Sequence, residues 1–231
     1  MFQPDGYVVA LAMMLITMIC WGSWANMRKL TPGWPFQLFY WDYVGGVLLA
    51  SLVLGLTMGS TGGPGGMIEN LRQADAASIF YALAGGTVFN IGNLLLVAAI
   101  SIAGLAVAFP VGIGIALIVG VLLNYVIAPA ANPLLLFAGV ALVLAAIIVD
   151  ALAYRARGSD GSANVARGLK IAIACGLLIG VFYPLVAKSM QGAGGLGPYA
   201  VSVVFSAGVF LSSSLFNPSP MHRPVTADPP C

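Results

Sequence analysis

The sequence predicts an all-α integral membrane protein, a multi-span helical bundle, and three observations lead to that fold class. Of 231 residues, 60% are apolar and 7% are charged, whereas roughly a quarter of the residues in a soluble domain are charged. The mean hydropathy of +1.00 excludes a disordered chain. No residue between Asp75 and Asp150 is charged. The apolar runs are continuous and do not alternate, so the spans are helices and not barrel strands.

Seven spans are expected, because about 20 apolar residues cross a hydrocarbon core about 30 Å thick. The first apolar run is longer than the core of a signal peptide, and Asp5 is the only charge before it. Turn-like composition at Ser101–Gly104 and Ala128–Pro133 divides the long uncharged run. The expected spans are 7–27, 36–58, 77–99, 104–127, 133–154, 169–190 and 198–216.

Three connecting segments are predicted to lie outside the spans. Residues 59–66 read GSTGGPGG and form a flexible turn, because the run lacks the Lys-Ser/Thr ending of a phosphate-binding loop. Residues 155–168 form a short polar linker. Residues 217–231 contain five prolines and form a non-helical tail.

The distribution of basic residues predicts the orientation in the cell membrane. Positively charged residues are enriched in cytoplasmic loops. One side of the predicted topology holds Arg28, Lys29, Arg155, Arg157, Arg167, Lys170 and Arg223, and the other side holds Arg72 and Lys188. A multi-pass protein is therefore expected with its N-terminus outside, and with the 155–168 linker and the C-terminal tail in the cytoplasm.

The chemistry of an enzyme has few candidates in this chain. The only histidine is His222, in the predicted tail, so no His-Cys metal site or Ser-His-Asp triad is expected within the membrane. A catalytic pair of carboxylates would have to use Asp42 and Asp150, which lie on different helices with nothing in the sequence to bring them together. We expect no catalytic residues, no cofactor and no metal, and the net charge of +2 indicates no nucleic-acid partner. Nothing in the sequence indicates an oligomeric state.

Polar side chains within the third span indicate a solute site. Gly86, Asn90 and Asn93 share one helix face by their spacing. Two carboxamides near the middle of the membrane can bind an uncharged solute through N–H and C=O groups, and the nearby glycines are expected to leave room beside them. The alternative is that the amides hydrogen-bond neighbouring helices.

Two prolines within spans add candidate binding groups. Pro110 precedes Gly112 in the fourth span, and Tyr183 precedes Pro184 in the sixth. A proline within a helix frees a backbone carbonyl four residues earlier, and a solute or water can use that acceptor. Tyr183 adds a phenol hydroxyl.

An aspartate and several aromatic residues lie near the first membrane boundary. Trp34, Phe36 and Trp41 are typical of an interfacial belt beside basic residues. Asp42 is costly inside a span unless it meets a cation, protein or water. It is expected either to pair with Arg28 or Lys29, or to bind a coupling proton.

Four segments together resemble the drug/metabolite transporter superfamily, and within it the ureide permease and glucose/rhamnose porter branches. They are Cys20–Asn26, FYWDY at Phe39–Tyr43, Phe89–Asn93 and AFPVGIGIALIVG at Ala108–Gly120. The resemblance implies ten helices in two inverted five-helix halves around a central site with alternating access. It also implies that Trp21, Trp24, Asn90, Asn93, Pro110 and Gly112 line that site, and Asn26 and Tyr183 are further candidates.

A weak internal repeat agrees with the inverted halves. Gly22-x-Trp24 aligns with Gly180-x-Phe182, and a five-helix unit places its second copy in the opposite orientation. We therefore expect a first repeat over 1–154 and the start of a second over 169–216, with the second half truncated.

The expected function is secondary active transport by alternating access, driven by a proton gradient. The partners are membrane lipid, a coupling proton and a small polar uncharged solute such as a ureide, a nucleobase or a sugar. Alternatives are a glucose/rhamnose-type uptake permease, an exporter of drugs or metabolites, and a membrane helper subunit.

Overall fold

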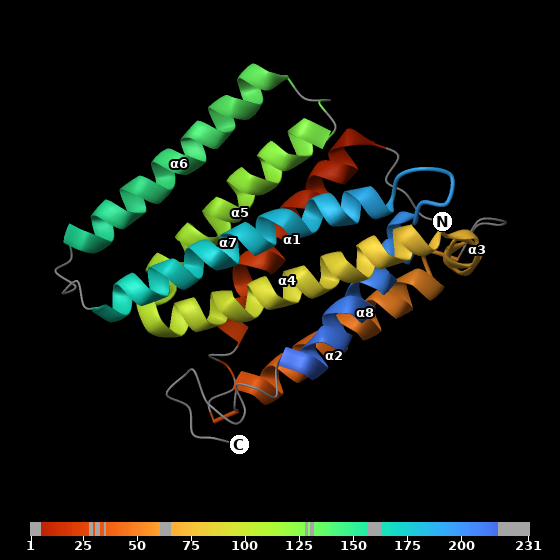
Figure 1. Ribbon diagram of the computed structural model, residues 1–231, viewed down its shortest axis with the longest axis horizontal. Helices are drawn as coiled ribbons and strands as arrows, with labels where there is room; N and C mark the ends of the chain where they lie inside the picture. The colour runs from red at the N-terminus through yellow and green to blue at the C-terminus, as the bar shows by residue number, and fades with distance from the viewer. Residues whose placement is uncertain are drawn as a thin grey trace.

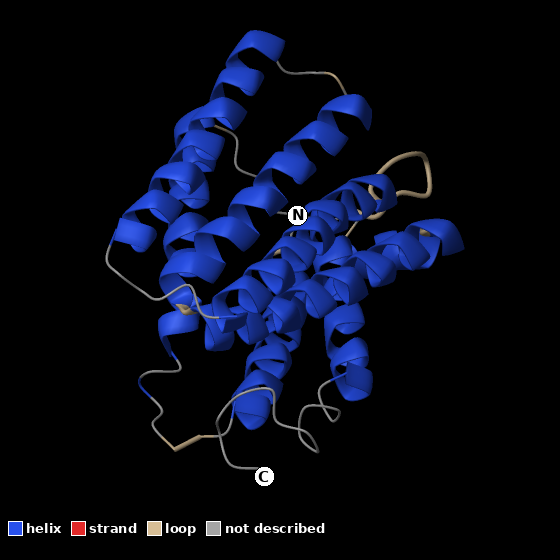
Figure 2. Cartoon of the chain, turned by 60° about the vertical axis from the view of Figure 1, so that its left-hand side comes forward, coloured by secondary structure: helices blue, strands red, loops and turns tan. Residues whose placement is uncertain are grey.

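The chain folds into a bundle of long helices (Figure 1). The computed structural model describes residues 6–27, 30, 33–34, 36–60, 66–127, 129, 132–156 and 163–216. Within these residues there is no strand, as Figure 2 shows. The helices are α1 (Tyr7–Met27), α2 (Phe36–Leu56), α3 (Met67–Gln73), α4 (Ala76–Ala103), α5 (Leu105–Ile127), α6 (Pro133–Ala156), α7 (Ala163–Ser189) and α8 (Pro198–Phe216).

Six of these helices, α2 and α4 to α8, are long and apolar enough to cross a membrane. They coincide with the second to seventh expected spans, which confirms a multi-pass helical membrane protein. The first expected span is also helical, but its apolar stretch within the described side chains, Tyr7–Ser23, is shorter.

The structure differs from the expected boundaries at three places. α4 continues to Ala103, so the turn expected at Ser101–Gly104 is reduced to Gly104. The φ of Gly104 is +81°, which suits glycine, and its N–H donates to the Ile100 carbonyl. The short helix α3 was not expected, and residues 61–65 of the flexible turn expected before it lie outside the described residues. α7 already begins at Ala163, so the described parts of the predicted 155–168 linker are helical.

Asn132 caps the start of α6, whereas most of the turn expected at Ala128–Pro133 lies outside the described residues. The Oδ1 of Asn132 accepts hydrogen bonds from the N–H groups of Leu134 (2.9 Å) and Leu135 (3.4 Å). These are donors that a helix start leaves unpaired, and Pro133 at the first helical position has no N–H to satisfy.

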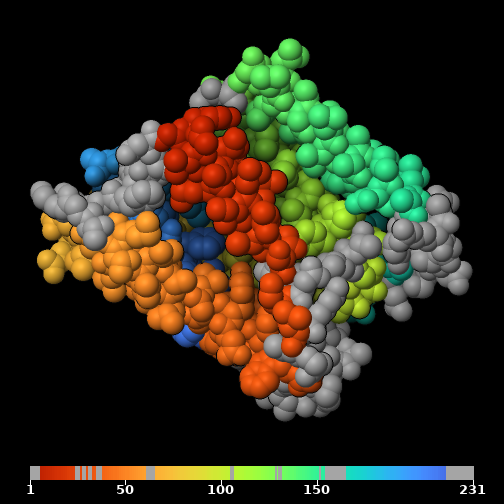
Figure 3. Space-filling view, turned by 180° about the vertical axis from the view of Figure 1, so that it is seen from behind, coloured from red at the N-terminus to blue at the C-terminus, as the bar shows by residue number. Residues whose placement is uncertain are grey.

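The helices α4 and α7 form the centre of the bundle. α4 packs along α7, and it also contacts α8 and α5, while α2 packs on α8 and α6 packs on α5. α1 lies at the surface, across the face seen in Figure 3, and its residues 7–20 are all exposed. Many residues of α4 are therefore buried in the interior of the bundle, and the polar ones among them include Asn90 and Asn93.

Glycines allow close contact between the central helices. A Cβ on Gly86 of α4 would meet the backbone of Phe205 and Val209 on α8, and a Cβ on Gly208 would lie 2.6 Å from the Leu83 carbonyl oxygen. A Cβ on Gly176 of α7 would lie 2.6 Å from the carbonyl oxygen of Gly112. Membrane helices associate largely through such small residues, because lipid gives no hydrophobic drive between them.

A polar clamp holds α3 to the loop between α7 and α8. The side chain of Asn70 donates to the Gly195 carbonyl (3.2 Å) and accepts from the Gly197 N–H (2.7 Å). Beside it, the Asp75 N–H donates to the Gly194 carbonyl (3.0 Å). The same segments also pack together in the buried cluster that contains Met67 and Leu196.

Substitution of Asn70 by alanine should lower the free energy of unfolding by about 1–3 kcal/mol, because two partly buried hydrogen bonds are lost. Thermal unfolding in detergent measures the loss, and hydrogen exchange should increase in residues 190–197. Gln73→Ala is the matched control, because the exposed Gln73 amide bonds only to Glu69 on the same short helix. Equal stability of the two variants would contradict the clamp.

Candidate functional site

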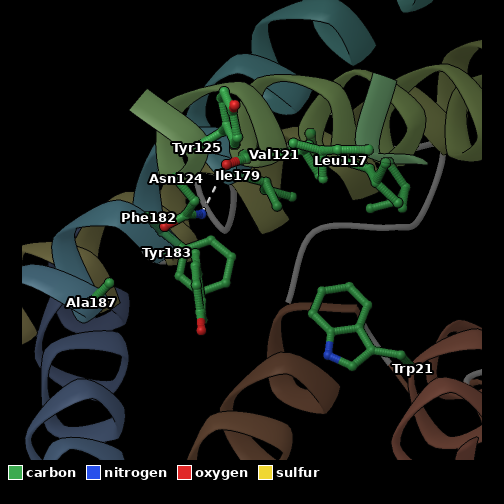
Figure 4. A pocket seen from close by; sticks show the side chains of 14 residues that line it. Trp21, Leu117, Val121, Asn124, Tyr125, Ile179, Phe182, Tyr183 and Ala187 are labelled. Atoms are coloured by element: carbon green, nitrogen blue, oxygen red, sulfur yellow. Dashed lines mark hydrogen bonds between the residues drawn. The ribbon is translucent and has the colours of Figure 1, made fainter. Parts of the chain in front are cut away.

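A pocket of about 720 Å³ lies between α1, α5, α6 and α7. Its volume is in the range typical of small-molecule sites, which are mostly apolar with a few polar groups. The apolar wall is formed by Ile113, Ala116, Leu117, Val121, Leu136, Ile179 and Ala187. Figure 4 shows Trp21 of α1 across the pocket from Tyr183 of α7.

Polar groups of α5 and α7 lie on the pocket wall. The Asn124 amide nitrogen donates to the Gly120 carbonyl oxygen at 2.8 Å, which fixes this carboxamide against α5. The Tyr183 side chain also lines the pocket and is 54% exposed. Gly180 lines it too, and Pro184 has no N–H to donate to the Gly180 carbonyl. The pocket thus combines a carboxamide, a phenol and a backbone acceptor.

An aromatic layer bounds the pocket on the side of α4. The Phe89 ring contacts Trp21 (centroids 5.9 Å apart, nearly perpendicular) and Phe182 (5.1 Å). Both of these partners line the pocket. Phe205 of α8 joins the layer through Phe89 (5.4 Å) and Phe182 (5.7 Å). The contacts of Phe89 with Trp21 and Phe182 are edge-to-face, which is an arrangement that aromatic rings prefer.

Behind this layer, Asn90 joins three helices through buried hydrogen bonds. Its Oδ1 accepts from the Tyr40 hydroxyl of α2 (2.6 Å) and from the Ser213 hydroxyl of α8 (3.2 Å). Its amide nitrogen donates to the Ser212 hydroxyl (2.9 Å). The Asn90 side chain is fully buried. It therefore acts in this structure as a link between α2, α4 and α8.

Asn93 lies beside this link but is less completely paired. Its amide nitrogen lies 3.3 Å from the Tyr40 hydroxyl. Its Oδ1 is buried and has no hydrogen-bond partner among the described residues. The space beside the two neighbouring glycines is taken up by helix packing, by the α8 backbone at Gly86 and by Ile179 at Gly92.

The structure divides the residues that the sequence suggested. Trp21 and Tyr183 line the pocket, whereas Asn90 and Asn93 lie in the buried network. Pro110 is partly buried in α5.

The remaining candidates lie away from the pocket or outside the description. Gly112 packs close to Leu96 and Ala172, and Asp42 is exposed on α2. The Trp24 and Asn26 side chains lie outside the described residues. Where the chain is described, no three His, Cys, Asp or Glu side chains could hold a metal ion together.

Sequence reasoning missed Asn124, Tyr125 and Phe182 as pocket residues. Asn124 had a usable signal, because it is a further carboxamide in the uncharged run that contains Asn90 and Asn93. Phe182 precedes Tyr183 and was noted only for the internal repeat. Which of these side chains share a pocket depends on how α1, α5 and α7 pack.

Residues 39–175 match the ureide permease family. Ureide permease 1 of Arabidopsis thaliana is 31% identical over 169 residues, which cover 71% of this chain and 43% of that protein. Ureide permease 2 of the same plant is 31% identical over 163 residues, with coverages of 68% and 41%. Probable ureide permease A3 of Vigna unguiculata is 28% identical over 165 residues, with coverages of 68% and 43%.

The chain thus spans less than half the length of these relatives. No solved structure matches it.

Proposed function

The chain belongs to the ureide permease family, and from this membership we propose that it transports ureides and similar small, polar, uncharged metabolites across the membrane. The pocket between α1, α5, α6 and α7 carries the proposal. Three of the four helices around it, α5, α6 and α7, are long and apolar enough to span the membrane, where a solute in passage must be held.

The pocket chemistry suits a ureide. An acyl urea presents alternating N–H and C=O groups on a flat frame. The Asn124 carboxamide, the Tyr183 hydroxyl and the Gly180 carbonyl supply donors and acceptors. Trp21 and Phe182 supply aromatic faces against which the flat frame can stack. Nucleobases share this chemistry, and sugars would use the same amide and ring faces.

The mechanism that we propose is secondary active transport by alternating access. In this mechanism two inverted halves, as in the drug/metabolite transporter superfamily, would move relative to each other around the central site. The first repeat would cover residues 1–154, and the second would begin at residue 169. The distribution of Lys and Arg supports an outside N-terminus and a cytoplasmic C-terminal tail. Asp42, exposed on α2 within a span, is the proposed proton carrier.

Uptake into proteoliposomes tests the proposal. Purified chain is reconstituted, and uptake of labelled allantoin, uracil, glucose and rhamnose is compared with and without an inward proton gradient. We expect allantoin or uracil uptake that the gradient increases, and we expect Asp42→Asn to abolish the increase but not binding. Uptake of sugars alone would favour the sugar permease, and binding without uptake would favour a helper subunit. Export of a toxic compound from expressing cells would favour an exporter.

A further inference from the structure

Asn93 has a buried carbonyl oxygen that no described donor reaches. The side chain is 1% exposed. A buried carbonyl without a donor is costly inside a membrane, because bulk water cannot replace the missing hydrogen bond. Such groups are rare in folded proteins, so this oxygen calls for a physical explanation.

The hydrogen bond from Tyr40 to Asn90 favours one orientation of the Asn93 amide. Tyr40 donates its hydroxyl proton to Asn90 Oδ1 at 2.6 Å, so its oxygen can only accept from Asn93. The Asn93 nitrogen lies 3.3 Å from the Tyr40 hydroxyl and supplies that hydrogen bond. While Tyr40 donates to Asn90, turning the Asn93 amide over would bring its oxygen to a hydroxyl whose proton is already used. The Asn93 oxygen therefore faces away from Tyr40.

The two amides consequently differ in what they can still bind. Asn90 is held by Tyr40, Ser212 and Ser213, and both its oxygen and its nitrogen have partners. Asn93 keeps a carbonyl acceptor without a partner. Asn90 is equipped to join helices, and Asn93 is equipped to receive a donor.

The free acceptor is linked to the pocket through Phe89 on the same helix, α4. Asn93 follows Phe89 by four residues, which places both on the same helix face. The Phe89 ring contacts Trp21 and Phe182, and both of these line the pocket. Asn93 is therefore one helical turn beyond the aromatic layer that bounds the pocket.

We propose that Asn93 Oδ1 is the acceptor of a second, deeper solute subsite. It takes an N–H group of the solute once the solute has passed the layer of Trp21, Phe89 and Phe182. The proposal rests on the proposed function, and it assigns to Asn93 the selection of solutes that carry an N–H donor. Asn90 keeps its structural role.

Equilibrium binding tests the subsite. Labelled allantoin is bound to the purified chain in lipid nanodiscs and displaced by hydantoin or by 1,3-dimethylhydantoin, which lacks N–H donors. We expect the wild type to prefer hydantoin. Asn93→Leu removes the acceptor at similar volume, and we expect it to weaken allantoin binding and to reduce the preference for hydantoin, each by about tenfold. Its thermal unfolding midpoint should not fall, because no unpaired carbonyl is left.

Asn90→Leu is the matched control on the same helix. It removes the buried hydrogen bonds that Asn90 makes with Tyr40, Ser212 and Ser213, so we expect a lower unfolding midpoint. The protein that remains folded should keep the wild-type preference for hydantoin. Asn90→Leu should therefore change stability without changing selectivity, and Asn93→Leu should change selectivity without lowering stability.

Three outcomes would overturn the subsite. The first is equal binding of hydantoin and its dimethyl derivative by the wild type. The second is unchanged allantoin binding by Asn93→Leu, which would assign the oxygen to a bound water. The third is an unfolding midpoint for Asn93→Leu as low as that of Asn90→Leu. In all three the transporter proposal stands, whereas failure of the wild type to bind any ureide or nucleobase rejects the proposed function and the subsite with it.

Discussion

Replacement of Gly86 by alanine is expected to lower the free energy of unfolding by about 1–3 kcal/mol, and replacement by valine by more. The added Cβ would meet the carbonyl oxygen of Phe205, and it would lie 3.0 Å from the Val209 nitrogen. Both atoms are backbone, so no rotamer change relieves the contact. α4 and α8 would have to move apart, and Asn90 would lose its hydrogen bonds to Ser212 and Ser213.

Gly46→Ala is the matched control for this substitution. Gly46 also lies within a membrane helix, but a Cβ there meets nothing within 4 Å. Alanine has the higher helix propensity, so the control should be neutral or more stable by up to about 1 kcal/mol.

Thiol labelling of Cys175 during heating measures the unfolding temperature of both variants, because Cys175 is buried until the bundle opens. Cys20 is exposed and would react at once. A background with Cys20→Ser and Cys231→Ser makes Cys175 the only reactive thiol. If Gly86→Ala unfolded at the same temperature as Gly46→Ala, the close approach of α4 and α8 would be wrong.

Replacement of Trp21 by alanine is expected to raise the KM for allantoin uptake by about tenfold or more, because it removes the aromatic wall opposite Tyr183. It should lower the unfolding midpoint little. Residues 7–20 of α1 are exposed, and the indole itself is only partly buried against the cluster of Tyr40 and Phe89. Uptake and thermal unfolding of the same preparation separate the two effects.

Two further tryptophan variants make this result specific. Trp21→Phe keeps a ring in the wall and should recover part of the affinity. Trp34→Ala removes an indole that is 49% exposed and does not line the pocket, so uptake should equal that of the wild type. If Trp21→Ala and Trp34→Ala had the same KM for allantoin, the proposal that the solute passes through this pocket would be wrong.

The long helices could be predicted because each is specified by its own segment. A continuous apolar run satisfies its backbone within one helix, so α2, α5 and α8 lie where composition alone placed them. Local turn chemistry likewise marked Asn132 before α6. The short helix α3 was harder to predict from the sequence. Its seven residues are held by contacts with residues 190–197, a loop that lies far away in the sequence.

The sequence by itself determined that this chain is a membrane bundle with amides and prolines inside its spans, because length, hydropathy and residue type are local properties. Only the tertiary structure decided what those groups face. The partners of Asn90 come from Tyr40 and Ser212, 50 and 122 residues away, and the pocket joins Trp21 to residues of α5 and α7. Partnerships between distant segments arise when helices pack, and no property of a single span encodes them.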